Sequence, residues 1–408
     1  MATDYTPYVI IDDVTMSKVM ERLNQGKAMA EKSYPHLTAD FERVINPKNA
    51  LPILGDVLCE ANQAEKTLQL TGSDSETWLQ ATLMLEDCEG EGRFCVSATS
   101  LLDALTPLSE QPVTILATTE SDNRFTLEHQ SGKAYFPIDN ADEYPTPQPT
   151  GSDSQLIEMD AKELATAIQV VGWATANDDL RPVMAGVYFD IMQDKTVVTA
   201  SDGHVLMKYA TKEDGCGPVG SFIMPKKVAK LLPQMLDWKE YDTCDVMFTE
   251  RQATIEQSNW SLTFRLVEGK YPNYESVIPK DSPFWMRADR SQLQNSVRKV
   301  SPFTNESSMM LRCTIKNNGL LIVGEDYDFS MGAEDQVLIE SNNPQAVTIG
   351  LKSSSLLAVL QKIPGMNVEV DYTDPSRAVT IIEAIDDEEK SKRKGEVLGL
   401  LMPMLVND

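Results

Sequence analysis

Three stretches of this 408-residue chain share one pattern, an apolar strand that runs into an acidic turn. They read LQLTGSDSETW at 68–78, VVTASDGHVLM at 197–207 and LLIVGEDYDFS at 320–330. Their turn residues Asp74, Asp202 and Asp326 are 128 and 124 residues apart. Self-similarity at a nearly constant interval indicates a repeated structural unit.

Two further landmarks recur at the same interval. The first is an apolar strand that passes through a short polar step into a Leu-rich amphipathic helix, at 94–105, 222–236 and 348–363. The second is a Tyr-Pro pair, at 144–145 and again 127 residues later at 271–272. Because three independent landmarks agree, the sequence predicts three copies of one unit of about 127 residues.

Each copy also contains a helical segment (18–44, 161–176 and 291–300) and then an alternating apolar stretch that favours a strand. The prediction is an α+β fold with three tandem domains. Pro, Gly and Ser at 146–155 and 277–283 are typical of connections between them. The predicted domains are 1–148, with an insertion at about 24–44, then 155–279 and 280–408. A tandem array of generic α+β modules, without a ring, would repeat in the same way.

Composition excludes several classes of protein. The chain has no run of about 18 apolar residues, which a membrane span requires, and no basic segment followed by an apolar one, which is typical of a secretory leader. We therefore place the chain in the cytoplasm. Six cysteines form no CxxC pair and there are only three histidines, so we expect neither a metal nor another cofactor. The net charge of −26 argues against a protein whose whole surface grips nucleic acid.

Four segments, in order along the repeat, carry a resemblance to a known family. LPILGDVL (51–58), TASDGHVL (199–206), VEGKYPNYESVIP (267–279) and LLMPM (400–404) resemble signature segments of the bacterial sliding clamp, the beta subunit of DNA polymerase III. The resemblance implies a head-to-tail homodimeric ring with helices lining the hole and sheets outside. Such a ring encircles duplex DNA, catalyses nothing itself, and tethers polymerase for processive synthesis. The implied partners are the DNA polymerase III alpha subunit, the clamp loader and other proteins with a clamp-binding motif.

The helices that the resemblance places around the hole are mildly basic. Basic residues outnumber acidic ones there by 14 to 8, although the whole chain has 36 basic and 62 acidic residues. The alternative is that these cations belong to ordinary solvated helix faces. The resemblance directs the following residues at DNA: Lys48, Lys226, Lys227, Arg298 and Lys299.

The resemblance also implies a surface for partner peptides between the second and third domains. The family often has arginine where this chain has Val205 and Ser276, so we expect a more apolar and less cationic rim. The alternative for LLMPM is an ordinary last strand of a core. The implied wall consists of Met184, Ser201, Gly203, His204, Val205, Leu206, Pro272, Ser276, Val277, Leu400, Met402, Pro403 and Met404.

Dimerisation in the family sets a strand of the first domain against the third domain of the other subunit. The apolar residues at matching positions are Phe136, in GKAYFP, and Pro302-Phe303, in KVSPFTN. Either phenylalanine could instead belong to a domain core.

Asp202 and His204 also resemble an acid-base dyad, and a rival hypothesis is an acidic enzyme on a repeated scaffold. However, the i, i+2 spacing across a glycine favours a turn, and no GxSxG nucleophile motif occurs. The equivalent turns also lack histidine. A second rival is a monomeric clamp paralogue that keeps the peptide surface but forms no ring.

Overall fold

The computed structural model describes residues 8–11, 44–45, 51–108, 111–118, 123–147, 154–177, 180–211, 218–316, 318–386, 388 and 392–406. The chain divides into two compact units. Unit 1 comprises Met1–Ala165 with Lys230–Leu266, and unit 2 comprises Thr166–Ala229 with Val267–Asp408. Among the described residues, no helix is long and apolar enough to cross a membrane.

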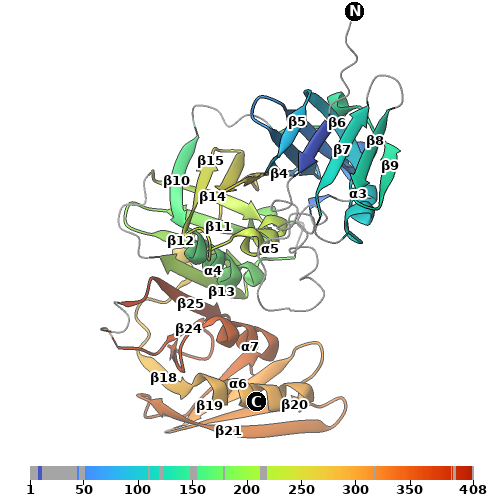
Figure 1. Ribbon diagram of the computed structural model, residues 1–408. Helices are drawn as coiled ribbons and strands as arrows, with labels where there is room; N and C mark the ends of the chain where they lie inside the picture. Colours follow the sequence, from blue (N-terminus) through green and yellow to red (C-terminus); the bar gives the residue numbers. More distant parts are fainter. Residues whose placement is uncertain are drawn as a thin grey trace, which may run out of the picture. The chain divides into compact units, whose positions relative to one another are not determined.

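The first repeat is built mainly of antiparallel strands in unit 1 (Figure 1). A short helix follows the sixth strand, and Ser97 caps its start by accepting a hydrogen bond from the Ser100 amide at 3.3 Å. The elements are β1 (Tyr8–Ile11), η2 (Pro52–Gly55), β2 (Asp56–Asn62), β3 (Thr67–Ser73), β4 (Thr77–Met84), β5 (Asp87–Glu89), β6 (Gly92–Ser97), α3 (Ala98–Leu105), β7 (Val113–Thr118), β8 (Arg124–His129), β9 (Gly132–Pro137) and η3 (Ala141–Glu143).

The second repeat follows a similar order of elements, with its strands divided between the two units. Its elements are β10 (Gln155–Asp160), α4 (Ala161–Val171), η4 (Gly172–Ala174), η5 (Pro182–Ala185), β11 (Gly186–Ile191), β12 (Thr196–Ser201), β13 (Val205–Thr211), β14 (Gly220–Pro225), α5 (Lys226–Met235), β15 (Thr243–Phe248), β16 (Gln252–Gln257), β17 (Trp260–Arg265) and η6 (Tyr274–Val277).

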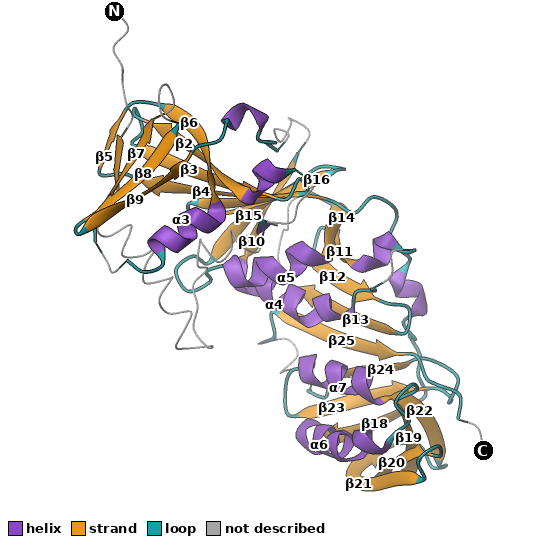
Figure 2. Ribbon diagram, turned by 90° about the vertical axis from the view of Figure 1, so that its right-hand side faces the viewer, coloured by secondary structure: helices purple, strands orange, loops and turns teal. Residues whose placement is uncertain are grey.

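The third repeat lies in unit 2, where α6 and α7 lie side by side on one face of the strands (Figure 2). Both helices bury one apolar stripe, including Val297 and Val359, which is why their sequences are amphipathic. The elements are β18 (Phe284–Asp289), α6 (Arg290–Val300), η7 (Ser301–Phe303), β19 (Met310–Lys316), β20 (Gly319–Asp326), β21 (Met331–Ser341), β22 (Val347–Lys352), α7 (Ser353–Lys362), β23 (Asn367–Tyr372), β24 (Val379–Glu383) and β25 (Gly395–Leu401).

Strand register repeats along with element order. In each repeat one strand (β6, β14 or β22) leads directly into a helix (α3, α5 or α7). This strand pairs antiparallel with β2, β11 or β19, and its last residue lies opposite the first residue of that partner strand. The three equivalent pairs are Asp56 with Ser97, Gly186 with Pro225 and Met310 with Lys352. The α+β character and the strand-to-helix step predicted from the sequence are therefore confirmed.

Neighbouring repeats are joined by strand pairing. In unit 1, β17 of the second repeat pairs with β4 of the first, within the eight-stranded sheet β10-β15-β16-β17-β4-β3-β2-β6. In unit 2, β25 pairs with β13, within the twelve-stranded sheet β14-β11-β12-β13-β25-β24-β23-β18-β21-β20-β19-β22. β9 is one of the two outer strands of the five-stranded sheet β5-β1-β7-β8-β9.

Each compact unit thus takes strands from two of the three predicted domains, and the predicted domain boundaries remain a prediction. The predicted insertion at 24–44 lies outside the described residues except for Val44, which is buried.

Candidate functional site

The acidic turn between β12 and β13 is held by one carboxylate. Asp202 Oδ1 accepts hydrogen bonds from the backbone amides of His204 and Val205, both at 2.8 Å. Gly203 lies between them with a φ of +92°, which glycine adopts without steric strain. The Asp202 carboxylate therefore acts as a turn cap.

The end of the chain runs along this turn. Strand β25 pairs with β13 over seven residues, from Val205 opposite Leu401 to Thr211 opposite Gly395. Just past β25, the Met402 amide donates to the His204 carbonyl at 2.8 Å. The Met404 amide then donates to the Gly350 carbonyl at 2.8 Å, so LLMPM connects the turn to β22.

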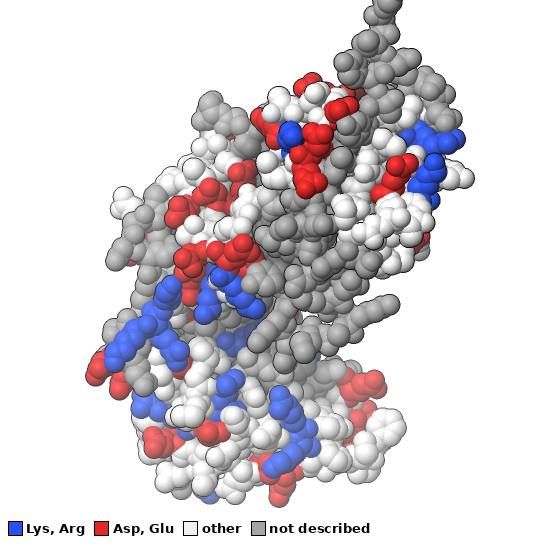
Figure 3. All heavy atoms as spheres, viewed as in Figure 1, with Lys and Arg blue, Asp and Glu red and all other residues white. Residues whose placement is uncertain are grey.

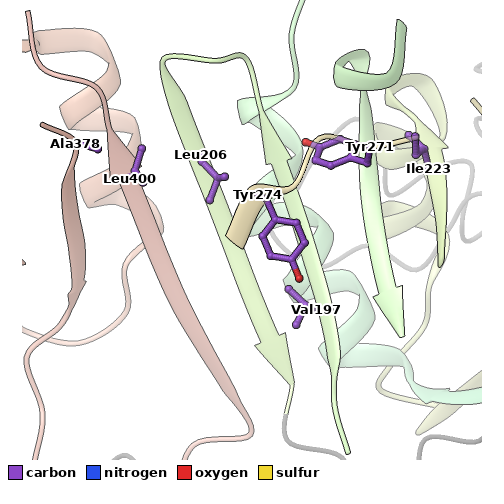
Figure 4. Packing of buried hydrophobic residues seen from close by; sticks show 7 residues of the cluster. All are labelled: Val197, Leu206, Ile223, Tyr271, Tyr274, Ala378 and Leu400. Carbon is purple, nitrogen blue, oxygen red and sulfur yellow. The ribbon is translucent and has the colours of Figure 1, made fainter. Parts of the chain in front are cut away.

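The segment after residue 266 packs across the same strands (Figure 4). Tyr271 stacks on Tyr188 with ring centroids 4.7 Å apart, and Tyr274 donates its hydroxyl proton to Asp190 Oδ2 at 2.9 Å. Burial raises the pKa of both phenols, that of Tyr271 to about 12, so both remain neutral. Leu206 and Leu400 belong to the same cluster. These contacts hold the segment that includes Pro272, Ser276 and Val277 against β11, β12 and β13.

The structure brings the predicted peptide residues together but divides them into two layers. Buried Leu206 and Leu400 lie beneath the surface, whereas Met402 and Val277 are 43% and 52% exposed. One expectation was wrong. Val205 is only 3% exposed, because it lies on the strand between β12 and β25, so it supports the surface and does not form its rim. Exposed residues are Gly203, His204, Pro272, Ser276, Val277 and Met402; partly buried ones are Met184, Ser201, Pro403 and Met404.

Arg181 is a residue of this surface that the sequence reasoning missed. Its Nη1 lies 3.7 Å from the Met184 sulfur and would lie 3.2 Å from a Cβ built on Gly203. This exposed guanidinium therefore stands over the turn. A single arginine in a loop gives no sequence signal, because its neighbour Gly203 is 22 residues further along the chain.

The predicted DNA-facing cations have different environments. Lys48 lies outside the described residues. Lys226 is half-buried, and its Nζ donates to Asn177 Oδ1 at 2.6 Å and to the Thr175 carbonyl at 3.4 Å, so it holds the loop after α4. Lys227 is the exposed second residue of α5. Figure 3 shows Lys and Arg side chains beside α4 and β25 as well as over α6 and α7, with Asp and Glu side chains among them.

Arg298 and Lys299 occupy the last turn of α6, where the helix dipole favours positive charge. Arg298 is exposed and makes one long contact, 3.5 Å to Asn295 Oδ1. Lys299 Nζ lies 2.9 Å from Asp335 Oδ2 on β21, and this contact lowers the pKa of that carboxyl. Lys299 is therefore engaged with the β21 edge, whereas the charge of Arg298 is available.

The predicted dimer residues lie beside two incompletely paired strands. Phe136 is on the outer strand β9, and its ring stacks at 4.8 Å on buried Phe125. Pro302 and Phe303 are exposed in η7, at the end of α6. Among the described residues, the part of β21 from 331 to 338 pairs only with β20. Phe136 is therefore partly a core residue, as the alternative held.

The structure resembles solved structures of one class of protein. The fold is that of DNA sliding clamps. A Pseudomonas aeruginosa sliding clamp bound to griselimycin matches with a TM-score of 0.84 and 23% identity, over 98% of this chain and 100% of that one. The DNA polymerase III beta subunit of Thermotoga maritima matches with a TM-score of 0.82 and 20% identity, over 98% and 100%.

Sequence comparison gives the family itself. Models of the DNA polymerase III beta subunit match here at 37–148 (N-terminal domain) and 158–273 (central domain), more than half of the chain. The beta sliding clamp of Vibrio cholerae is 24% identical over 86% of this chain and 95% of its own length; that of Pseudomonas aeruginosa is 25% identical over 85% and 92%. The chain belongs to the bacterial DNA polymerase III beta subunit family and is a DNA sliding clamp.

Proposed function

We propose that two copies of this chain close head to tail into a ring around duplex DNA. The ring would hold DNA by topology and not by affinity, in keeping with the net charge of −26. A few cations such as Arg298 would keep the duplex centred, because each further phosphate contact adds a counterion-release term that slows sliding.

The observation that carries this proposal is the identical register of the two junctions within the chain. Thr77 and Val205 are each the first residue after their acidic turn, and they lie opposite Phe264 and Leu401. The third turn returns at Met331, which is opposite Asp326 in β20. Met331 is therefore the equivalent of Thr77 and Val205, on the part of β21 (331–338) for which β20 is the only described partner.

The strand that would pair with β21 in a third junction of this kind is β9 of a second copy. Phe136 is the fifth residue of six-residue β9, as Phe264 is of β17. Applying the internal register places Met331 opposite Phe136 of the partner subunit. Glu334 then lies opposite Lys133 of the partner subunit, an opposite-charge pair that favours this register. In the proposed ring this head-to-tail junction closes after two copies, whereas one that did not close would form a filament.

Engineered cysteines test this register. Ala333 lies opposite Ala134 of the partner subunit, and opposite residues have Cβ atoms close enough for a disulfide. The Ala134→Cys, Ala333→Cys variant should form a covalent dimer on oxidation. The control, Ala134→Cys with Gln336→Cys, is three residues out of register and should not. Equal cross-linking of both, or a wild-type chain that stays monomeric in light scattering, would refute the ring.

Topological holding has its own test. After loading, the ring should remain on circular DNA at high salt and leave linear DNA through the free ends. Equal retention on the two DNAs would show holding by contact.

We further propose that the surface at the Asp202 turn binds a short peptide with apolar anchors. Partners that would carry such a peptide are the DNA polymerase III alpha subunit, the clamp loader and other proteins with a clamp-binding motif. Exposed Met402 and Val277 offer adaptable apolar contact, and methionine side chains adjust to different anchors. The Asp202 carboxylate is occupied by backbone amides, which supports a binding role without catalysis.

Truncation tests the peptide surface. Removing residues 402–408 deletes Met402 and Met404 and the hydrogen bond to His204, so a polymerase-derived peptide should lose at least about 100-fold in affinity, measured by fluorescence anisotropy. Lys239→Ala, a change in the exposed segment after α5, is the control. Unchanged affinity of the truncated protein would refute the assignment.

A further inference from the structure

The three acidic turns share one cap but differ in length. Asp74, Asp202 and Asp326 each accept hydrogen bonds on Oδ1 from the amides two and three residues on. The first two turns have two residues before the chain returns, Ser75-Glu76 and Gly203-His204. The third has four, Tyr327-Asp328-Phe329-Ser330. We call these four residues the aromatic turn.

The aromatic turn is fixed in place, yet its rings are exposed. Tyr327 donates its hydroxyl proton to Glu325 Oε2 at 2.7 Å, and Asn305 Nδ2 donates to Asp328 Oδ2 at 3.2 Å. Nevertheless Tyr327 and Phe329 are 78% and 73% exposed, beside partly exposed Met331. Ordered aromatic side chains exposed at a strand end are typical of an interaction surface.

The internal junctions show what such a turn faces. The Glu76 carbonyl accepts a hydrogen bond from the Arg265 amide, and the His204 carbonyl accepts one from the Met402 amide, both at 2.8 Å. In each junction the donor is the first residue past the paired segment of its strand. In the subunit junction the same register sets Ser330 opposite Pro137 of the partner subunit.

Proline has no backbone N–H, so the hydrogen bond made at both internal junctions cannot form at the subunit junction. What Pro137 offers instead is an exposed apolar ring, whereas the next residue, Ile138, is buried in its own unit. We infer that the aromatic turn packs on the exposed Pro137 ring of a second copy of this chain, replacing the missing hydrogen bond by apolar contact. This inference rests on the proposed ring and adds to it a surface outside the paired strands.

The test is dimer dissociation measured by sedimentation equilibrium over a dilution series. Phe329→Ser should weaken the dimer about tenfold, because buried aromatic side chains dominate interface affinity. Met366→Ser is the matched control: Met366 is 78% exposed in unit 2 in the loop between α7 and β23, and its loss should leave the dissociation constant unchanged. Circular dichroism and the thermal midpoint establish that each variant is folded.

A photo-cross-linking residue at 329 gives an independent readout. Mass spectrometry should identify a cross-link to the peptide containing Pro137 of the partner subunit. If the wild-type chain does not dimerise, the ring proposal itself fails. If it dimerises but Phe329→Ser dissociates like Met366→Ser, or position 329 cross-links elsewhere, the ring stands and the packing of the aromatic turn is wrong.

Discussion

The strand junctions inside the chain and the two incompletely paired edges, on β9 and on residues 331–338 of β21, have different kinds of side chain. The β13–β25 junction has buried leucines opposite each other at Leu206 and Leu400, and nearby tyrosines close it. β9 and β21 instead have charged and exposed residues, among them Lys133 and Glu334. Charges on an edge strand prevent indiscriminate pairing. A permanent joint can be apolar, whereas a joint between subunits has to be both selective and separable.

The largest effect is expected from a lysine substitution that compares the buried β13–β25 junction with the exposed β9 edge. Leu400→Lys places an unpaired charge in the buried β13–β25 junction and should destabilise the fold by about 3 kcal/mol or more. The matched change on the edge, Tyr135→Lys, alters an exposed side chain and should cost less than about 1 kcal/mol of folding stability while weakening the dimer. Urea unfolding of both variants below the dimer dissociation constant measures the difference. Equal destabilisation would show that β9 is as much a core strand as β25.

Charge exchange tests the selectivity of the edge. Lys133→Glu and Glu334→Lys should each place like charges opposite each other, at a cost of about 1 kcal/mol per junction and thus about 2 kcal/mol for a ring with two junctions. The double variant should recover most of the lost affinity. Sedimentation equilibrium at low and high salt measures this, with Lys239→Glu as a charge-matched control. Additive losses in the double variant would mean that the two residues do not face each other.

Much of the fold followed from the sequence because its signals are local. A polar step after an apolar strand predicts a helix start, and α3, α5 and α7 begin at those steps. The burial of Val205 was not predictable in this way, because it depends on pairing with β25, almost 200 residues away. The same holds for Lys299 and Asp335, which are 36 residues apart and meet only when β21 folds against α6. The sequence indicated which residues gather at the site; the structure showed which of them are accessible.

The smallest effect is expected from a substitution in unit 1 that lies on neither β9 nor β21. At the start of β2, burial and then repulsion from Asp139 raise the pKa of the 7% exposed Asp56 carboxyl from 3.8 to about 6. The folded protein therefore keeps this proton to a higher pH than the unfolded chain does, so stability should fall as pH rises from about 4 to 6. Asp56→Asn cannot ionise and should remove up to about 2 kcal/mol of that fall. Urea unfolding at several pH values measures it, and exposed Asp103→Asn on α3 should keep the wild-type slope. Because Asp56 lies on neither β9 nor β21, its replacement should leave dimer dissociation unchanged; a shift in both would show that the edge depends on the ladder behind it.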